Sequence, residues 1–135
     1  MKLELKHLSP YLPYKLKLRF MHPYVDHQTI GVLNNIYNCD DDVKLSVNYS
    51  DDEHIWMYKP ILRPLSDFKG MIVRDIKIEL ELSHNQVMEF FGFMDGEIKL
   101  DNITLGLYNA MCKKYIDFNG LIEKKLAIDI NTLNN

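Results

Sequence analysis

The stretch YKLKLRF, residues 14–20, alternates without a break between apolar and basic side chains. A period of two is typical of a β-strand that buries one of its faces. The apolar members would face a core, and the basic members Lys15, Lys17 and Arg19 would face solvent. This stretch predicts that the N-terminal half of the chain is built from strands.

Three further segments of the first half, residues 29–37, 43–49 and 54–62, also predict strands, because 43–49 alternates again and the other two place apolar residues on one side. Polar residues that are typical of turns separate them at 38–42 and 50–53. Four short strands joined by polar turns predict a small, bent antiparallel sheet or an SH3-like barrel.

The second half of the chain is mixed. Residues 76–82 alternate again and predict one more strand. Ser83 and Gln86 have the spacing of a capping box, and an apolar stripe with helical spacing follows over 87–94. Asp101-Asn102 is a candidate cap for a second helix. We therefore expect an α+β fold in which two or three helices of the C-terminal half pack on the sheet.

The 135 residues, of which 47% are hydrophobic and 26% charged, suit one globular domain rather than a disordered chain. We expect a single domain, residues 1–135, with a β-rich lobe over 1–68 and a strand plus helices over 69–135. Cys39 and Cys112 lie far apart and are expected to be reduced thiols. With no signal peptide or membrane span in the sequence, we expect a cytoplasmic protein of a bacterial host.

The charge is unevenly distributed, although the net charge is only −3. Residues 1–20 contain five basic and one acidic side chain, whereas residues 21–58 contain seven acidic and one basic. The basic face formed by Lys15, Lys17 and Arg19, with Tyr11 and Tyr14 nearby, is a candidate for binding nucleic acid. A solvent-facing strand of any half-buried sheet has the same appearance, because charges discourage edge pairing.

The acidic residues of the first half lie in two groups, Asp40, Asp41 and Asp42, and Asp51, Asp52 and Glu53. Consecutive carboxylates cannot all point at one ion, and the glycine and final glutamate of a calcium loop are missing, so solvated turns are the simpler interpretation. The alternative is an acidic interaction surface that imitates nucleic acid towards a basic groove.

One loose pattern suggests a metal-dependent nuclease. Asp67, followed by Asp75 and Lys77 on an expected strand, has the composition of two magnesium ligands and a lysine that polarises water. Charges on an edge strand explain the same pattern. No nucleophile elbow, phosphate-binding glycine loop or histidine metal spacing is present, so we expect no cofactor, no metal and no catalytic residues. Trp56 is expected either in the core or as an exposed interface anchor.

Three blocks of the sequence carry a resemblance: LSPYLPY (8–14), KPILRPLSD (59–67), and FNGLIEK (118–124) with LAIDINTL (126–133). The chain resembles a family of small uncharacterised proteins that are encoded by phages and prophages of Bacteroidetes bacteria. The resemblance implies a shared scaffold and a phage origin, but no activity and no site residues. Within these blocks, Pro10 and Pro13 are expected to hold the entry segment extended, and Pro60 and Pro64 to bracket the end of a strand. Gly120 is expected to supply a backbone geometry that lets the C-terminal segment fold back.

These observations favour a non-enzymatic accessory protein of a phage or prophage that occupies a surface on a host or phage protein or nucleoprotein. Inhibition of host defence, as anti-CRISPR proteins do, is one such role. Direct nucleic-acid binding by the basic face is the first alternative, and a metal-dependent nuclease is the second. No membrane partner is expected.

Overall fold

The computed structural model describes residues 2–21, 29–39 and 42–133 of the chain. The chain divides into two compact units, Met1–Leu62 with Asn119–Asn135, and Arg63–Phe118. The first unit, here called the sheet unit, contains every strand of the described residues, and the second, the helical unit, contains the three longest helices. The expected α+β class is confirmed.

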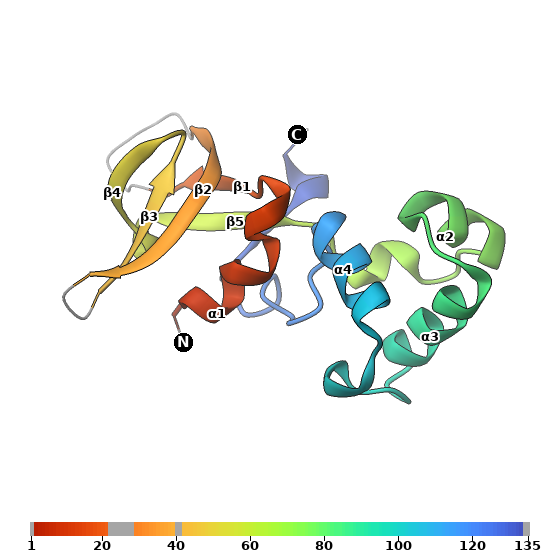
Figure 1. Ribbon diagram of the computed structural model, residues 1–135. Coiled ribbons are helices and arrows are strands. Elements are labelled where there is room, and N and C mark those ends of the chain that lie inside the picture. The colour runs from red at the N-terminus through yellow and green to blue at the C-terminus, as the bar shows by residue number, and fades with distance from the viewer. Residues whose placement is uncertain (1, 22–28, 40–41, 134–135) are drawn as a thin grey trace. The chain divides into compact units, whose positions relative to one another are not determined.

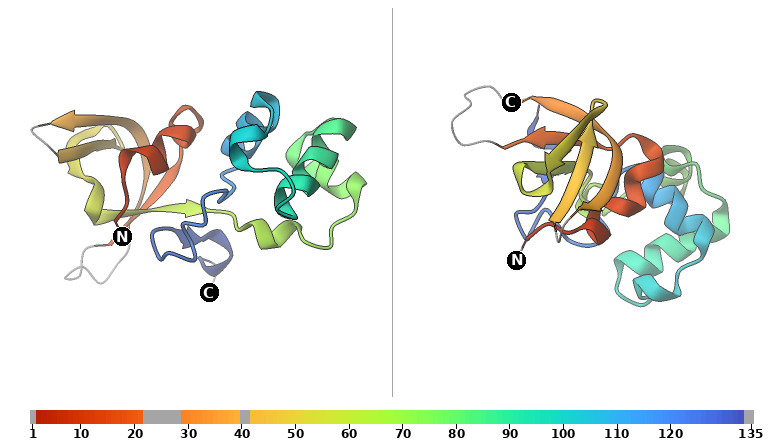
Figure 2. Two further views of the ribbon diagram at one scale, coloured as in Figure 1. Left: turned by 90° about the horizontal axis from the view of Figure 1, so that it is seen from below. Right: turned by 60° about the vertical axis from the view of Figure 1, so that its left-hand side comes forward.

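One sheet of six strands forms the sheet unit (Figure 1). The strands are β1 (Lys17–Phe20), β2 (Ile30–Cys39), β3 (Asp42–Val47), β4 (Ser50–His54), β5 (Tyr58–Leu62) and β6 (Ile128–Asp129). Their order is β4-β3-β2-β1-β5-β6, and all neighbours are antiparallel except β5 and β6. Because β4 and β6 remain edges, the sheet does not close into a barrel. The bent sheet is confirmed, and its curvature is visible in β2 and β3 (Figure 2).

Strand β1 begins later than the sequence pattern predicts. The expectation that Pro10 and Pro13 hold the entry segment extended is wrong, because residues Ser9–Tyr14 form a 3₁₀ helix that contains both prolines. Lys15 then adopts a left-handed conformation with φ of 58°, which turns the chain into the strand. The predicted inward face is confirmed for Leu16 and Leu18, which are fully buried.

The second predicted turn, residues 50–53, is wrong. These residues belong to β4, which pairs with β3 from Val47↔Ser50 to Lys44↔His54. The chain reverses at Asn48 and Tyr49, which both have positive φ, 51° and 63°. Two consecutive left-handed residues are the geometry of a tight hairpin turn, and asparagine tolerates it well. The acidic residues therefore lie on an edge strand and not in a loop.

The predicted strand 54–62 is divided in two. Ile55–Met57 forms a 3₁₀ helix, and β5 begins only at Tyr58. This short helix places Ile55 in the core and Trp56 at the surface, with exposed fractions of 6% and 67%.

The helices are α1 (Leu5–Leu8) in the sheet unit, and α2 (Val73–Leu80), α3 (His84–Met94) and α4 (Leu105–Lys113) in the helical unit. The predicted strand 76–82 is wrong, because most of it belongs to α2. Ile76, Ile78 and Leu80 alternate, but Ile76 and Leu80 also have the i, i+4 spacing of a helix. In the structure these two are buried and Ile78 is 70% exposed, as a helical period requires.

Helix α3 begins at the predicted capping box. The backbone N–H of Gln86 donates to Ser83 Oγ (3.3 Å), and the N–H of Ser83 donates to Gln86 Oε1 (2.9 Å). Phe90, from the predicted apolar stripe, is fully buried and packs edge-on against Phe68, with ring centroids 5.4 Å apart.

The predicted cap of the next helix, Asp101-Asn102, is wrong, since these residues form part of a 3₁₀ turn. Thr104 caps α4 instead, and its hydroxyl accepts from the N–H of Leu107 (3.4 Å) while donating to Glu89 Oε1 (2.7 Å). Glu89 thereby joins α3 to the start of α4.

Gly120 has a φ of +69°, which confirms that it supplies a backbone geometry that other residues resist. After it the chain rejoins the sheet unit, where Ile128 and Asp129 pair with Ile61 and Leu62. In the part of the chain that the structure describes, no helix has both the length and the apolar character needed to cross a lipid bilayer.

Candidate binding site

A pocket of about 360 Å³ lies in the sheet unit. Five segments contribute to this pocket: the N-terminal segment, the start of β3, the 3₁₀ helix Ile55–Met57, the start of β5 and the C-terminal segment. Its apolar lining comes from Leu3, Val43, Ile55, Trp56, Tyr58 and Leu126. Its charged lining comes from two cations and two acids, Lys2, Lys59, Glu4 and Asp42.

Trp56 is the most unusual member of this lining, because two thirds of its surface is exposed. Its indole stacks on the imidazole of His54, with ring centroids 5.8 Å apart and an interplanar angle of 26°. Burial of the preceding Ile55 anchors the short helix that carries the indole. The interpretation of Trp56 as a core residue is therefore wrong, and the alternative of an exposed aromatic side chain holds.

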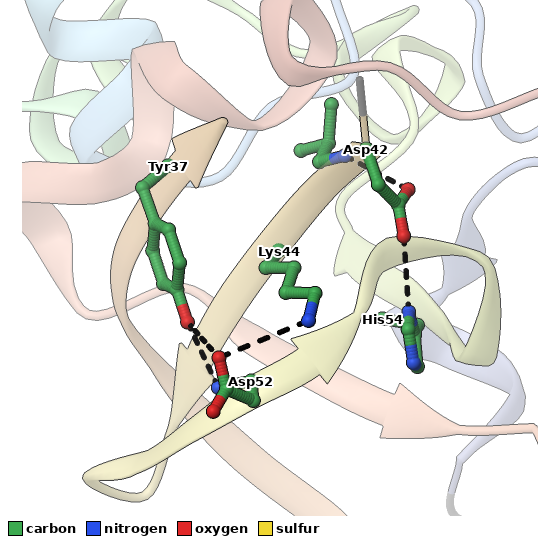
Figure 3. Close-up of polar contacts among 6 residues, drawn as sticks. Tyr37, Asp42, Lys44, Asp52 and His54 are labelled. Carbon is green, nitrogen blue, oxygen red and sulfur yellow. Dashed lines mark hydrogen bonds and ion pairs between the residues drawn. The ribbon is translucent and has the colours of Figure 1, made fainter. Parts of the chain in front are cut away.

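A hydrogen bond fixes the ring on which Trp56 stacks. The Nδ1–H of His54 donates to Asp42 Oδ2 at 3.1 Å, from β4 to β3 (Figure 3). Both side chains are about 40% exposed, so solvent screens the pair and its contribution to stability is small. Its role is geometric, since it holds the imidazole against the indole at the edge of the pocket.

A second polar group lies on the same strands, around Asp52 (Figure 3). The hydroxyl of Tyr37, on β2, donates to Asp52 Oδ1 (2.9 Å) and accepts from the N–H of Asp52 (2.9 Å). Lys44, on β3, lies 3.9 Å from the same carboxylate. The hydrogen bond to Asp52 raises the pKa of Tyr37, with small further effects of burial and of Asp51. Asp52 is thus a structural residue that holds the edge strand β4.

The acidic interaction surface that the sequence suggests is only partly available. Asp40 and Asp41 lie outside the described residues. Asp42 and Asp52 are engaged in the contacts above, and Glu53 interacts with the hydroxyl of Tyr58, whose pKa is raised first by burial and then by Glu53. Asp51 is exposed, and its side chain forms no hydrogen bond or ion pair with the residues that the structure describes.

The basic face is more coherent. Strand register places Arg19 directly opposite Ile30 on β2 and Lys59 on β5, so Lys59 joins the row of Lys17 and Arg19 on one side of the sheet. Within the described parts of the chain, none of these three side chains, nor Lys15, forms an ion pair. Lys15 precedes the strand and is also exposed. Tyr11, in contrast, is fully buried and cannot stack on a base.

The structure does not assemble the three nuclease candidates. Asp67 is paired with Arg63, whose Nε lies 3.3 Å from its carboxylate. Asp75 and Lys77 lie two residues apart on helix α2, so their side chains diverge, whereas the hypothesis required a strand. A search of residues 2–21, 29–39 and 42–133 found no group of three or more His, Cys, Asp or Glu side chains that could hold a metal ion.

The arrangement around Trp56 is suited to binding. An exposed indole beside an apolar pocket offers a large contact area, and the surrounding charges of both signs favour a complementary polar rim. The sequence did not predict the pocket, because the lining residues lie far apart along the chain, and it left open whether Trp56 is buried or exposed. Comparison of the chain with protein-family models, with curated proteins and with solved structures found no match.

Proposed function

We propose that this protein is a non-enzymatic binding module that acts by occupying a surface on another protein, and that the Trp56 pocket receives an apolar side chain of that partner. The observation that carries the proposal is the 67% exposure of Trp56 at the pocket of about 360 Å³. An exposed aromatic side chain beside an apolar pocket is characteristic of interface hot spots.

The charges around the pocket indicate the chemistry of the partner. Lys2 and Lys59 carry positive charge, and Glu4 and Asp42 carry negative charge, in the same lining. A nucleic acid would place phosphates against the two carboxylates, which is unfavourable. A protein segment with an apolar anchor between charged residues of both signs complements the pocket without that penalty.

The resemblance to proteins of phages and prophages extends this proposal to the identity of the partner. It would be a host or phage protein, alone or within a nucleoprotein complex, in the cytoplasm of the host. A host-defence complex of the CRISPR type is one class of target that such a protein would inhibit by steric occupation.

The test is capture of partners from infected host cells with three matched baits: the wild type, Trp56→Ala and Tyr49→Asn. Tyr49 is 86% exposed in the same unit, and asparagine suits its positive φ, so this variant removes an exposed aromatic side chain away from the pocket. Because a hot-spot truncation costs about 2 kcal/mol or more, we expect Trp56→Ala to weaken binding of the specific partner at least about thirtyfold.

The Tyr49→Asn bait should retain the same partner with an affinity close to that of the wild type. Circular dichroism of all three baits checks that each is folded. If no protein is captured by both the wild type and Tyr49→Asn and lost with Trp56→Ala, the proposal is wrong.

A second candidate function, direct binding of nucleic acid, is favoured by the row formed by Lys17, Arg19 and Lys59. Three cations on one side of adjacent strands, which form no ion pair within the described residues, are the kind of groups that neutralise backbone phosphates. The affinity for DNA or RNA should then fall steeply with salt, and the substitution of Lys15, Lys17 and Arg19 by alanine should abolish it. Binding that does not depend on salt, or that survives this substitution, would remove the candidate.

A further inference from the structure

A second pocket of the sheet unit, with a volume of about 300 Å³, has a lining that is unusually rich in hydrogen-bond donors. Four residues form it: Lys6, His7, Asn119 and Lys124. Two come from helix α1 and two from the segment that follows the helical unit, so the folded chain brings them together. The lining contains two cations and no carboxylate.

His7 is the residue that gives this pocket its chemistry. Its side chain belongs to a residue that is only 8% exposed, and its Nδ1 accepts a hydrogen bond from the N–H of Glu4 (2.9 Å). A neutral imidazole whose Nδ1 accepts must carry its proton on Nε2. No fully buried side-chain nitrogen or oxygen of the described residues lacks a hydrogen-bond partner. The structure shows a partner for Nδ1 of His7 but none for Nε2 among these residues, so Nε2 is not fully enclosed and is the ring nitrogen available to a ligand in the pocket that His7 lines.

The other donors are held close by. The ammonium of Lys124 donates to the carbonyl of Asn119 (3.3 Å), which uses one of its three N–H groups and leaves two. The ammonium of Lys6 lies 3.4 Å from Glu4, a contact in which both side chains are at least half exposed. A carboxylate this exposed is easily replaced as a partner, because exposed ion pairs contribute little.

We propose that this pocket binds a phosphate group, with Lys6, Lys124 and the Nε2–H of His7 as its donors. Two ammonium groups and one imidazole N–H suit the two negative charges and several acceptor oxygens of a phosphate. The proposal is independent of the proposed function, because none of these residues lines the Trp56 pocket or belongs to the basic row.

The electrostatics of His7 agree with this geometry. Burial lowers its pKa, Glu4 raises it, and Lys6 and Lys124 lower it further. The two lysines thus act on the ring that faces the pocket. An anion placed between them would reverse their effect and favour the imidazolium, so binding of an anion should raise the pKa of His7.

The test is an NMR titration of the full chain with inorganic phosphate, and separately with a nucleoside monophosphate, at matched ionic strength. Lys124→Gln and Lys125→Gln form a matched pair: both remove one charge from neighbouring exposed positions, but only Lys124 lines the pocket. We expect saturable shifts at His7, Asn119 and Lys124, about tenfold weaker binding for Lys124→Gln, and nearly unchanged binding for Lys125→Gln. Tighter binding of the nucleotide would identify a phosphate monoester as the ligand, and equal binding would identify phosphate itself.

A titration of the His7 ring with and without sulfate, which stays dianionic near neutral pH, provides the second readout. The pKa of His7 should rise when sulfate is bound. Three outcomes would overturn the proposal: shifts spread over Lys15, Lys17 and Arg19, equal weakening in the two lysine variants, or a pKa of His7 that sulfate does not change.

Discussion

Cys112 shows how burial controls the chemistry of a single residue. It is 1% exposed on helix α4, and burial raises its pKa to about 11, although its contact with Tyr108 opposes this effect. At about pH 8 only about one thousandth of this thiol is then ionised, and the thiolate is the reactive form. It belongs to the core of the helical unit.

We therefore predict that Cys112 of the folded protein does not react with Ellman's reagent near pH 8, whereas in denaturant both cysteines react. Mass spectrometry after alkylation with iodoacetamide identifies which thiol is modified. Modification of Cys112 at the same rate in the folded and unfolded protein would contradict this account.

His7 makes a prediction about the pH dependence of stability. Its pKa is lowered from 6.5 in the folded state, first by burial, so the unfolded chain binds the proton more tightly. The neutral ring of His7 contributes fully to the free energy of unfolding above pH 6.5. This contribution is lost as the pH falls from 6.5 through the lower pKa of the folded state.

The free energy of unfolding, measured with urea between about pH 5 and 7.5, should accordingly fall with decreasing pH in the wild type. The variant His7→Gln preserves an acceptor for the N–H of Glu4 and does not titrate, so its stability should fall less over the same range. Identical slopes for the two proteins would show that His7 is not the residue responsible.

At the scale of elements, the capping box of α3 is the local feature that the sequence specified most completely. Ser83 and Gln86 satisfy each other's backbone N–H groups as predicted. Ser83→Ala should lower the free energy of unfolding by about 1 kcal/mol, and Ser83→Thr, which preserves the hydroxyl, by only a few tenths. Equal losses in the two variants, measured by chemical denaturation, would mean that the cap does not stabilise the helix.

Gly120 makes a second prediction at this scale. Its φ is +69°, and a Cβ added there meets no atom within 4 Å, so only the backbone resists a side chain. Gly120→Ala should cost about 1 kcal/mol of unfolding free energy for this reason. Thermal melting of Gly120→Ala and Gly120→Asn checks this prediction, because asparagine tolerates the left-handed region better than alanine. An alanine variant as stable as the wild type would refute the prediction.

The elements that the sequence did not predict share a physical cause. Over residues 76–80 the apolar side chains fit both a strand and a helix, and packing of Ile76 and Leu80 selected the helix. The hairpin turn at Asn48 and Tyr49 depends on two left-handed residues. The acidic residues that follow are the more obvious turn signal in the sequence, so the sequence pattern predicts the turn at 50–53 instead. The alternation of apolar and polar residues correctly predicted the strands around Leu18 and Leu45, because only the two-residue period of a strand fits the sequence there.

At the scale of the whole molecule, the candidate sites could not be predicted because each is assembled from distant segments. The Trp56 pocket combines residue 2 with residue 126, and the donor-rich pocket combines residue 6 with residue 124. Both depend on the return of the chain to the sheet unit after residue 118. In contrast, the basic row was visible in the sequence, since Lys17 and Arg19 lie on one strand, and only its third member, Lys59, required strand pairing.

The central claim is that Trp56 is a contact residue of a protein interface. It is the only tryptophan in the chain, so its fluorescence reports on that position alone. The measurement is a titration of the protein with a partner captured by the wild-type bait. The partner either lacks tryptophan or has its own emission subtracted. The emission of the exposed indole should shift to shorter wavelength as the partner excludes water from its surface. An emission maximum that stays unchanged when the complex is saturated would contradict the account.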